Sequence, residues 1–220
     1  MIRKKLKDFG FGSAHSPFNF RDYMILASFF PEGGEATMQE VIKRTGLAYA
    51  PVNESLNSLA KAGVLEKKTV GRTGVFRMDL GSSHAFMGYT QYQIYQNIEF
   101  SEKYPKVYRL LKRIIESTNP MALIVYGSYA KGEARKDSDV DFLIVDDKFR
   151  HPGGKLPNYD SVISGEEMSS GYELNGLISE YLEFANEDKD RAFWQELKQW
   201  GIALEGWDTT YNAFYRRRNK

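Results

Sequence analysis

The stretch that decides the fold is Ala122–Val145, which reads ALIVYGSYAKGEARKDSDVDFLIV. Two short apolar runs, Ala122–Tyr126 and Phe142–Val145, stand at its ends, and a connection rich in charged and small residues lies between them. Each run holds β-branched or aromatic residues next to turn-forming ones, which favours strand over helix. The stretch therefore predicts two strands joined by a polar connection.

The connection begins with Gly127 and Ser128. Glycine permits a tight turn and a close approach of the backbone to a ligand. Ser128 is expected to cap a short helix over residues 129–133, which leaves free N–H groups at the helix start. Such a helix start binds phosphate oxygens well. The connection therefore predicts a phosphate-binding turn.

A pair of acidic residues, Asp139 and Asp141, leads into the second strand. Because side chains alternate along a strand, both carboxylates should project to one side and Val140 to the other. Adjacent carboxylates repel each other unless a cation lies between them, and Mg²⁺ or Mn²⁺ with a bound triphosphate would serve. An Asp-x-Asp pair can also be a solvated strand end, but its spacing from Gly-Ser between two strands favours a metal–nucleotide site.

At these residues the sequence resembles the polymerase-beta-like nucleotidyltransferase superfamily. Gly127-Ser128 and the two acids match its pattern, and the residues between them fit the small stand-alone members. The resemblance implies a mixed-sheet domain with flanking helices over residues 119–220, and an enzyme that transfers a nucleoside monophosphate from an NTP, expected to be ATP, to an acceptor hydroxyl. The implied catalytic and metal-binding residues are Asp139 and Asp141, and the implied nucleotide-binding residues are Gly127, Ser128, Lys131 and Ser138.

Two of these assignments have an alternative. Lys131 adds a cation near the phosphates in one interpretation and is a surface lysine in the other. The resemblance also implies a third carboxylate on a neighbouring strand, which would act as general base. Asp160, in the short segment Tyr159–Ile163, is the candidate for this catalytic acid, and it can equally be a residue at a strand start.

Composition narrows the class of protein. The chain of 220 residues has no cysteine, which excludes disulfides, thiolate metal sites and cysteine nucleophiles. It has no signal peptide and no apolar run long enough to span a bilayer, so a cytoplasmic location without a membrane partner is expected. Residues 1–82 hold 12 Lys+Arg and 8 Asp+Glu, and the remainder holds 18 and 21. This mild asymmetry suits a basic N-terminal module that touches a polyanion.

Residues 1–82 predict three helices followed by a hairpin. The first helix covers the aromatic segment Phe18–Phe30. The second begins with a capping box at Thr37 and stops at Gly46, and the third has Pro51 at its first position and an apolar face of Val52, Leu56 and Leu59. Two strands, Val64–Val70 and Val75–Leu80, follow around a glycine-containing tip.

This order of elements resembles a winged helix-turn-helix. The resemblance implies that the third helix enters the major groove of double-stranded DNA and that the hairpin tip lies near the backbone. The candidate DNA-binding residues are Tyr49, Asn53, Asn57, Ser58, Lys61 and Arg72. A winged helix can also dock proteins, and Glu54 among the candidates would repel phosphate.

Residues 83–118 predict a helical linker, with Pro105 between two helices. Its tyrosines recur at helical spacing and are interpreted as packing, part of which could be a homodimer seam. In the second half, Glu166–Asn186 and Arg191–Trp200 predict helices, Gly201–Leu204 predicts a closing strand or turn, and the arginines at 216–218 predict a solvated terminus.

Three functions follow from this combination. The first is a Mg²⁺-dependent nucleotidyltransferase with a regulatory DNA-binding unit. The second is a transcription regulator whose nucleotidyltransferase half only senses nucleotide. The third is an antitoxin-like protein that modifies or masks a toxin-like partner. Scattered histidines and the lack of a P-loop motif argue against zinc sites, hydrolase triads and P-loop ATPases.

Overall fold

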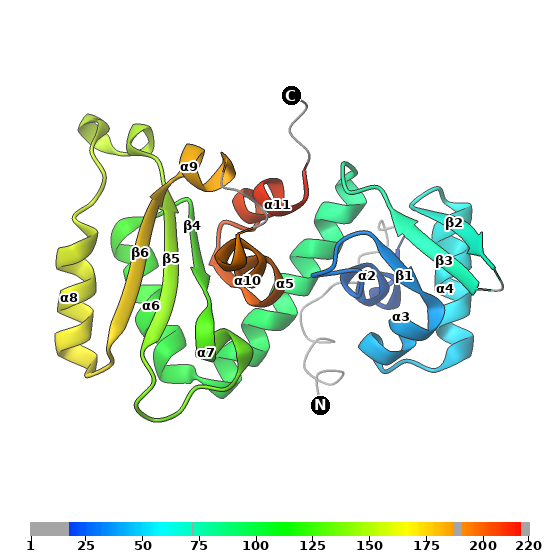
Figure 1. The fold of residues 1–220 in the computed structure, drawn as a ribbon, viewed down its shortest axis with the longest axis horizontal. Helices are drawn as coiled ribbons and strands as arrows, with labels where there is room; N and C mark the ends of the chain where they lie inside the picture. The colour runs from blue at the N-terminus through cyan, green and yellow to red at the C-terminus, as the bar shows by residue number, and fades with distance from the viewer. Residues whose placement is uncertain (1–17, 72, 187–190, 217–220) are drawn as a thin grey trace. The chain divides into compact units, whose positions relative to one another are not determined.

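A computed structural model describes residues 18–71, 73–186 and 191–216 (Figure 1). The chain divides into two compact units, Met1–Tyr92 and Gln93–Lys220, and helix α5 (Ser83–Lys103) runs across the boundary. In the described residues, no helix combines the length and the apolar character that a membrane span needs.

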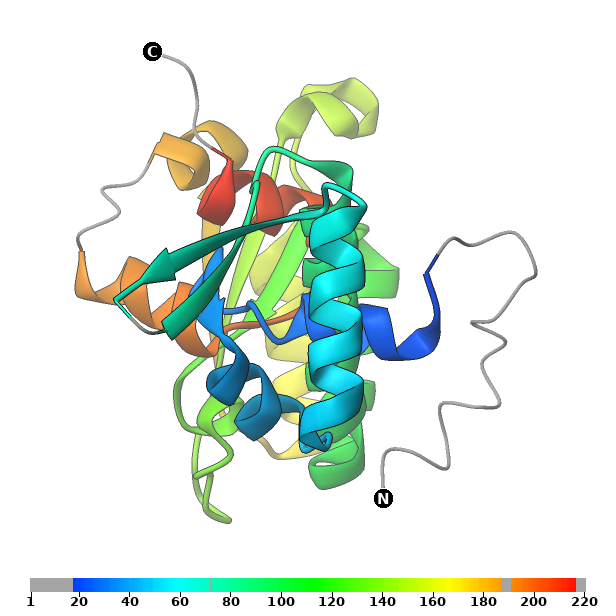
Figure 2. The same ribbon diagram turned by 90° about the vertical axis from the view of Figure 1, so that its right-hand side faces the viewer.

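The first unit contains three helices and a small antiparallel sheet. Its elements are, in chain order, α2 (Phe20–Ala27), β1 (Glu35–Thr37), α3 (Met38–Thr45), α4 (Tyr49–Lys61), β2 (Leu65–Val70) and β3 (Thr73–Met78). The sheet order is β1-β3-β2. Figures 1 and 2 show α4 alongside the β2–β3 hairpin, against which it packs.

The helix limits of this unit follow from local signals. Thr37 and Glu40 form the predicted capping box, and Gly46 ends α3 with a left-handed φ of 63°. The predicted start of the third helix is wrong by two residues, because α4 begins at Tyr49 and Pro51 is its third residue. Its predicted apolar face of Val52, Leu56 and Leu59 is confirmed as fully buried.

The second unit is built on a mixed sheet of four strands. Helix α6 (Pro105–Thr118) leads into β4 (Ala122–Val125), and α7 (Gly127–Lys131) connects β4 to β5 (Val140–Asp146). The sheet order is β6-β5-β4-β7, in which β5 and β6 are parallel and the other pairs are antiparallel. The two predicted strands of the opening stretch are confirmed, and so is the mixed α and β character of the fold.

The remaining elements surround this sheet. After β5 come two short 3-10 segments, η2 (Lys148–Arg150) and η3 (Pro152–Gly154), and then α8 (Tyr159–Ser170), β6 (Leu174–Glu180), α9 (Tyr181–Asn186), α10 (Ala192–Trp200), β7 (Ile202–Glu205) and α11 (Trp207–Tyr215). Apolar side chains of α6 and α8 pack in one cluster with one face of the sheet. Helices α9 and α11 contact the strands as well, and α10 contacts α7.

One predicted helix is wrong. The range Glu166–Asn186 was expected to be helical throughout, but it contains the end of α8, the whole of β6 and then α9. Strand β6 pairs with β5 along its full length. A side chain at position 176 would prevent this pairing, because its Cβ would lie 2.8 Å from the Phe142 ring and 2.7 Å from Ile163. Gly176 has no Cβ and so lets β6 pack this closely. The strand is therefore set by tertiary packing.

Candidate active site

The turn after β4 brings the backbone against an acidic side chain. Gly127 has a φ of 67°, in the left-handed region that favours glycine. The amide of the preceding Tyr126 donates to the carbonyl oxygen of Asp141 at 3.0 Å. A Cβ at position 127 would overlap the carboxylate of Asp141, since it would lie only 3.2 Å from its Cγ. Position 127 therefore requires glycine for its conformation and for its space.

The predicted cap at Ser128 is wrong. Helix α7 begins two residues earlier than predicted, at Gly127, so Tyr126 is the cap residue and no side chain caps the helix. The reason is the left-handed turn at Gly127, which directs the chain into the helix at once. Ser128 is the second helical residue, and its carbonyl accepts a hydrogen bond from the amide of Glu133 at 2.8 Å.

Asp139 and Asp141 converge as predicted on the side opposite to the buried Val140. The side-chain amide of Asn175 donates to Oδ2 of Asp139 at 2.5 Å and to Oδ1 of Asp141 at 3.4 Å. Since one nitrogen reaches both carboxylates, a single cation can reach both as well. Burial raises the pKa of Asp141, and repulsion from Asp139 adds to this, while the bond from Asn175 acts in the opposite direction.

The structure gives Lys131 and Ser138 partners within the protein. Nζ of Lys131 lies 2.5 Å from Oε1 of Glu196 on α10, and this bond raises the pKa of the lysine. The Ser138 hydroxyl accepts a hydrogen bond from the amide of Arg135 at 2.9 Å, which closes the turn before the acids. Ser138 therefore adjoins the acid pair through its place beside Asp139, whereas Lys131 is held by Glu196 on α10.

Three further residues beside the acids were missed from the sequence: Asn175, Tyr126 and Glu196. Tyr126 packs edge-to-face on Phe193 of α10, with ring centroids 5.1 Å apart. Burial raises the pKa of Tyr126 to about 12, with contributions from Asp141 and Glu196. The segment of α10 was correctly predicted to be a helix, but no local signal placed it beside α7.

Comparison with known proteins gives one match, which lies in this part of the chain. Residues 107–205 match the model of the nucleotidyltransferase domain family. The match covers a little under half of the chain and includes every predicted nucleotide-binding and catalytic residue. It supports the nucleotidyltransferase prediction for this part of the chain and, in general terms, a transferase activity that uses an NTP. No curated protein and no solved structure gives a significant match to the chain.

Among the residues that the structure describes, β6 places no third carboxylate beside Asp139 and Asp141, although the resemblance implied one on a neighbouring strand. Strand β6 is that neighbour, and its residue in register with Asp141 is Asn175. Within residues 18–71, 73–186 and 191–216, no group of three or more His, Cys, Asp or Glu side chains is arranged to hold a metal ion. The donors at this position are two carboxylates and one neutral amide.

The strand interpretation of Asp160 is wrong, because this residue lies in the first turn of α8 and is exposed. The hydroxyl of its neighbour Tyr159 donates to Asp146, at the far end of β5 from Asp141. Asp146 lies five residue steps along the strand from Asp141, a distance of about 17 Å. The fold of the second unit therefore does not bring Asp160 to the acid pair.

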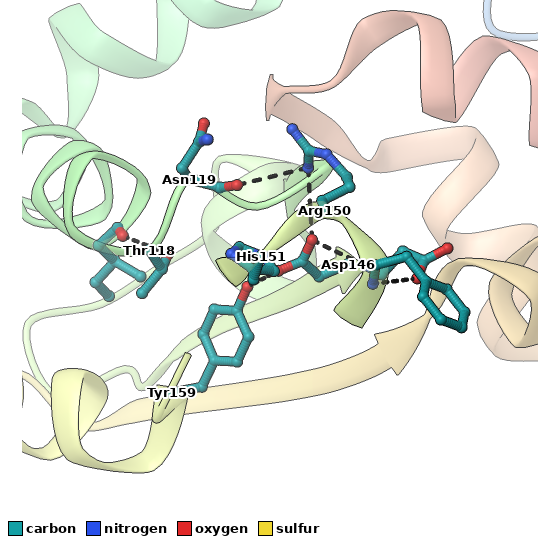
Figure 3. Close-up of polar contacts among 9 residues, drawn as sticks. Thr118, Asn119, Asp146, Arg150, His151 and Tyr159 are labelled. Carbon is teal, nitrogen blue, oxygen red and sulfur yellow. Dashed lines mark hydrogen bonds and ion pairs between the residues drawn. The ribbon is translucent and has the colours of Figure 1, made fainter. Parts of the chain in front are cut away.

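Asp146 is the centre of a separate polar network in this domain (Figure 3). Its carboxylate is fully buried and contacts Nε2 of His151 at 2.6 Å, the hydroxyl of Tyr159, and Nη1 of Arg150 at 3.4 Å. Burial and the bond to Asp146 raise the pKa of Tyr159 well above its usual range. The network holds the loop after β5 to the end of that strand, so its role is structural.

Five of the six candidate DNA-binding residues lie on helix α4 of the first unit. Tyr49 is 64% exposed, Ser58 and Lys61 are exposed, and Asn53 and Asn57 are half-buried. The Asn57 amide donates to the side-chain oxygen of Asn53 at 2.8 Å, and Nζ of Lys67 donates to Asn57 at 3.0 Å. Arg72 lies outside the described residues. Helix α4 therefore presents these five side chains opposite its buried apolar face.

Proposed function

We propose that the chain is a Mg²⁺-dependent nucleotidyltransferase that transfers a nucleoside monophosphate from ATP to an acceptor hydroxyl, and that a DNA-binding winged helix places this activity in a regulatory setting. The observation that carries the proposal is the convergence of Asp139 and Asp141 opposite Gly127. This convergence lies within the segment that matches the nucleotidyltransferase domain family.

The donors at the acid pair fit a hard divalent cation. Asp139 and Asp141 would hold it, and magnesium sites of this kind commonly combine one or two carboxylates with phosphates of the substrate. When bound, the ion would supply charge stabilisation at the transferring phosphate and the leaving pyrophosphate. The two acids supply the negative charge that this ion requires.

The chain's own residues would position the triphosphate. Gly127 lacks a side chain where the backbone approaches Asp141, which leaves room for the Asp141 carboxylate to lie against the turn. Lys131, on the adjoining helix, would exchange its bond with Glu196 for a phosphate, because both side chains are about one-third exposed. Precise positioning of this kind accounts for much of the rate in group-transfer reactions.

The first unit supports the winged-helix part of the proposal. Its order of helices and strands, with α3 and α4 followed by the antiparallel β2–β3 hairpin, is the order of that fold. Helix α4 would then be the recognition helix. Glu54, the acidic residue on it, is paired with Arg21 at 3.0 Å, which reduces its repulsion of phosphate.

Transfer is tested by incubating the full chain with α-labelled ATP, Mg²⁺ and a cell lysate. Label on a macromolecule is expected with the parent chain and should be lost in Asp139→Asn. Asp137→Asn is the matched control, because it removes the same charge from an exposed residue of the same connection. Equal labelling by the parent chain and Asp139→Asn would reject the enzyme.

A nucleotide sensor is the second candidate, and Asn175 favours it. A neutral amide cannot take a proton from an acceptor hydroxyl as a carboxylate does. A sensor would bind ATP with Mg²⁺ and lose binding in Asp139→Asn, but it would label nothing in the lysate. The same two variants therefore separate the two functions.

DNA contact has its own test. Each phosphate contact contributes about 0.9 to the slope of log affinity against log salt concentration. Lys61→Ala and Arg72→Ala together should lower that slope by about 2 in binding to mixed double-stranded DNA fragments. Lys155→Ala, an exposed lysine of the second unit, should leave it unchanged. A slope equal to that of the parent chain in the double variant would exclude these two contacts.

A further inference from the structure

The side chain of Asn175 lies within hydrogen-bond distance of both acids, Asp139 and Asp141. It lies on β6, in register with Asp141 on the parallel strand β5. Its amide nitrogen is 2.5 Å from Asp139 and 3.4 Å from Asp141. Alternation along β6 places Asn175 on the opposite face from Gly176, which packs against Ile163 and Phe142. Asn175 is therefore directed to the acids by the strand itself.

The amide nitrogen occupies the position between two like charges that a cation would take. An N–H donor between two carboxylates offsets part of their repulsion but carries no net charge. The same side chain has a carbonyl oxygen, which is a suitable ligand for a hard divalent cation. Rotation of the amide group exchanges its nitrogen and its oxygen without moving the backbone.

We propose that Asn175 is the third, neutral ligand of the cation site, which turns its oxygen to the ion and makes the site selective for the metal–triphosphate complex over the free metal ion. This inference rests on the proposed function. Two carboxylates and an amide hold a divalent cation with one negative charge fewer than three carboxylates would. In the proposed site the phosphates of the nucleotide supply this third negative charge. The cation therefore binds together with the nucleotide.

A purely structural role for Asn175 predicts something different. If the amide only joins β6 to the acids, Asn175→Ala weakens the fold but leaves binding of the Mn²⁺–ATP analogue complex by the folded chain unchanged. If Asn175 is a ligand, Asn175→Asp completes a three-carboxylate site and binds the free ion. Asn212→Asp is the matched control, because it adds the same charge to a partly exposed position on α11 of the same unit.

The experiment measures Mn²⁺ binding to the full chain by electron paramagnetic resonance, with and without a non-hydrolysable ATP analogue. The parent chain should bind Mn²⁺ much more tightly with the analogue than without it. Asn175→Asp should bind free Mn²⁺ at least about tenfold more tightly, because a unit charge at ligand distance has a large effect. Asn175→Ala should bind the Mn²⁺–analogue complex several-fold more weakly, and Asn212→Asp should match the parent chain.

Two results would overturn the inference while leaving the proposed function in place. One is free Mn²⁺ affinity in Asn175→Asp equal to that of Asn212→Asp. The other is parental binding of the Mn²⁺–analogue complex by Asn175→Ala. If the parent chain and Asp139→Asn bind the complex equally, the proposed function and this inference fail together. Thermal unfolding with and without Mn²⁺ confirms for each variant that the folded chain is being measured.

Discussion

Replacing Gly127 with alanine tests whether the turn after β4 sets the position of Asp141. The substitution has two separate effects at this position. It places a residue with a Cβ at a φ of 67°. It also places that Cβ in the space of the Asp141 carboxylate, 3.2 Å from Cγ and 3.3 Å from Cβ of Asp141. The Asp141 carboxylate must therefore leave its observed position.

Gly171→Ala separates the two effects. Gly171 has a φ of 72°, and a Cβ there has no neighbour within 4 Å. The left-handed conformation costs an alanine about 1–2 kcal/mol, and this cost is common to both variants. With a urea m-value of about 2 kcal/mol/M, each midpoint should fall by about 0.5–1 M. Only Gly127→Ala should also displace Asp141 and lose binding of the Mn²⁺–ATP analogue.

The assay combines urea unfolding followed by fluorescence with Mn²⁺ binding in the presence of the ATP analogue. The expected result is similar stability loss in the two variants and at least tenfold weaker binding in Gly127→Ala alone, since overlap with a ligand side chain moves it out of place. If Gly127→Ala binds Mn²⁺ with the ATP analogue as tightly as the parent chain does, the reasoning is refuted. Asp141 would then bind the ion from a position other than the observed one.

Three further changes test other parts of the fold. Tyr159→Phe removes a hydroxyl donor from the buried Asp146 carboxylate and should lower the free energy of unfolding by about 1.5–3 kcal/mol in urea titrations; a change within the error of the measurement would contradict the buried network. Arg113 lowers the pKa of Glu166 from 4.5, so their ion pair stabilises the fold above that pH and is lost as the pH falls further. The stability difference between Arg113→Gln and the parent chain should therefore shrink between pH 7 and pH 3 in thermal melts, and a constant difference would contradict this. Thr37→Ala removes the cap of α3 and should cost about 1 kcal/mol, whereas an unchanged melting curve would show that the cap is not needed.

Features encoded by neighbouring residues could be predicted from the sequence. The capping box at Thr37 needs only Glu40, three residues along, and the glycine at position 46 ends the same helix. Strands β4 and β5 are short apolar runs bounded by turn residues, and the alternation around Val140 fixes the side on which Asp139 and Asp141 lie. These signals depend on local geometry, which the sequence carries directly.

Features set by distant packing could not be predicted. Leu174, Leu177 and Ile178 recur at a spacing that also suits a helix, and β6 becomes a strand because it pairs with β5. Asn175 was missed for this reason, since its place beside Asp141 exists only once that pairing is known. The start of α7 was misplaced because the left-handed conformation of Gly127 turns the chain one residue before the expected cap.

The parallel pairing of β5 and β6 has a consequence for how a newly synthesised chain matures. The β4–β5 ladder joins segments close in sequence, so it brings the acids opposite Gly127 with little loop-closure entropy. Asn175 arrives only after α8 has crossed over and β6 has docked at the outer edge. Until then the two carboxylates repel each other without a donor between them. Docking of β6 therefore adds the outer strand to the sheet. It also places an N–H donor between the two carboxylates, which reduces the repulsion that exists while only β4 and β5 are paired.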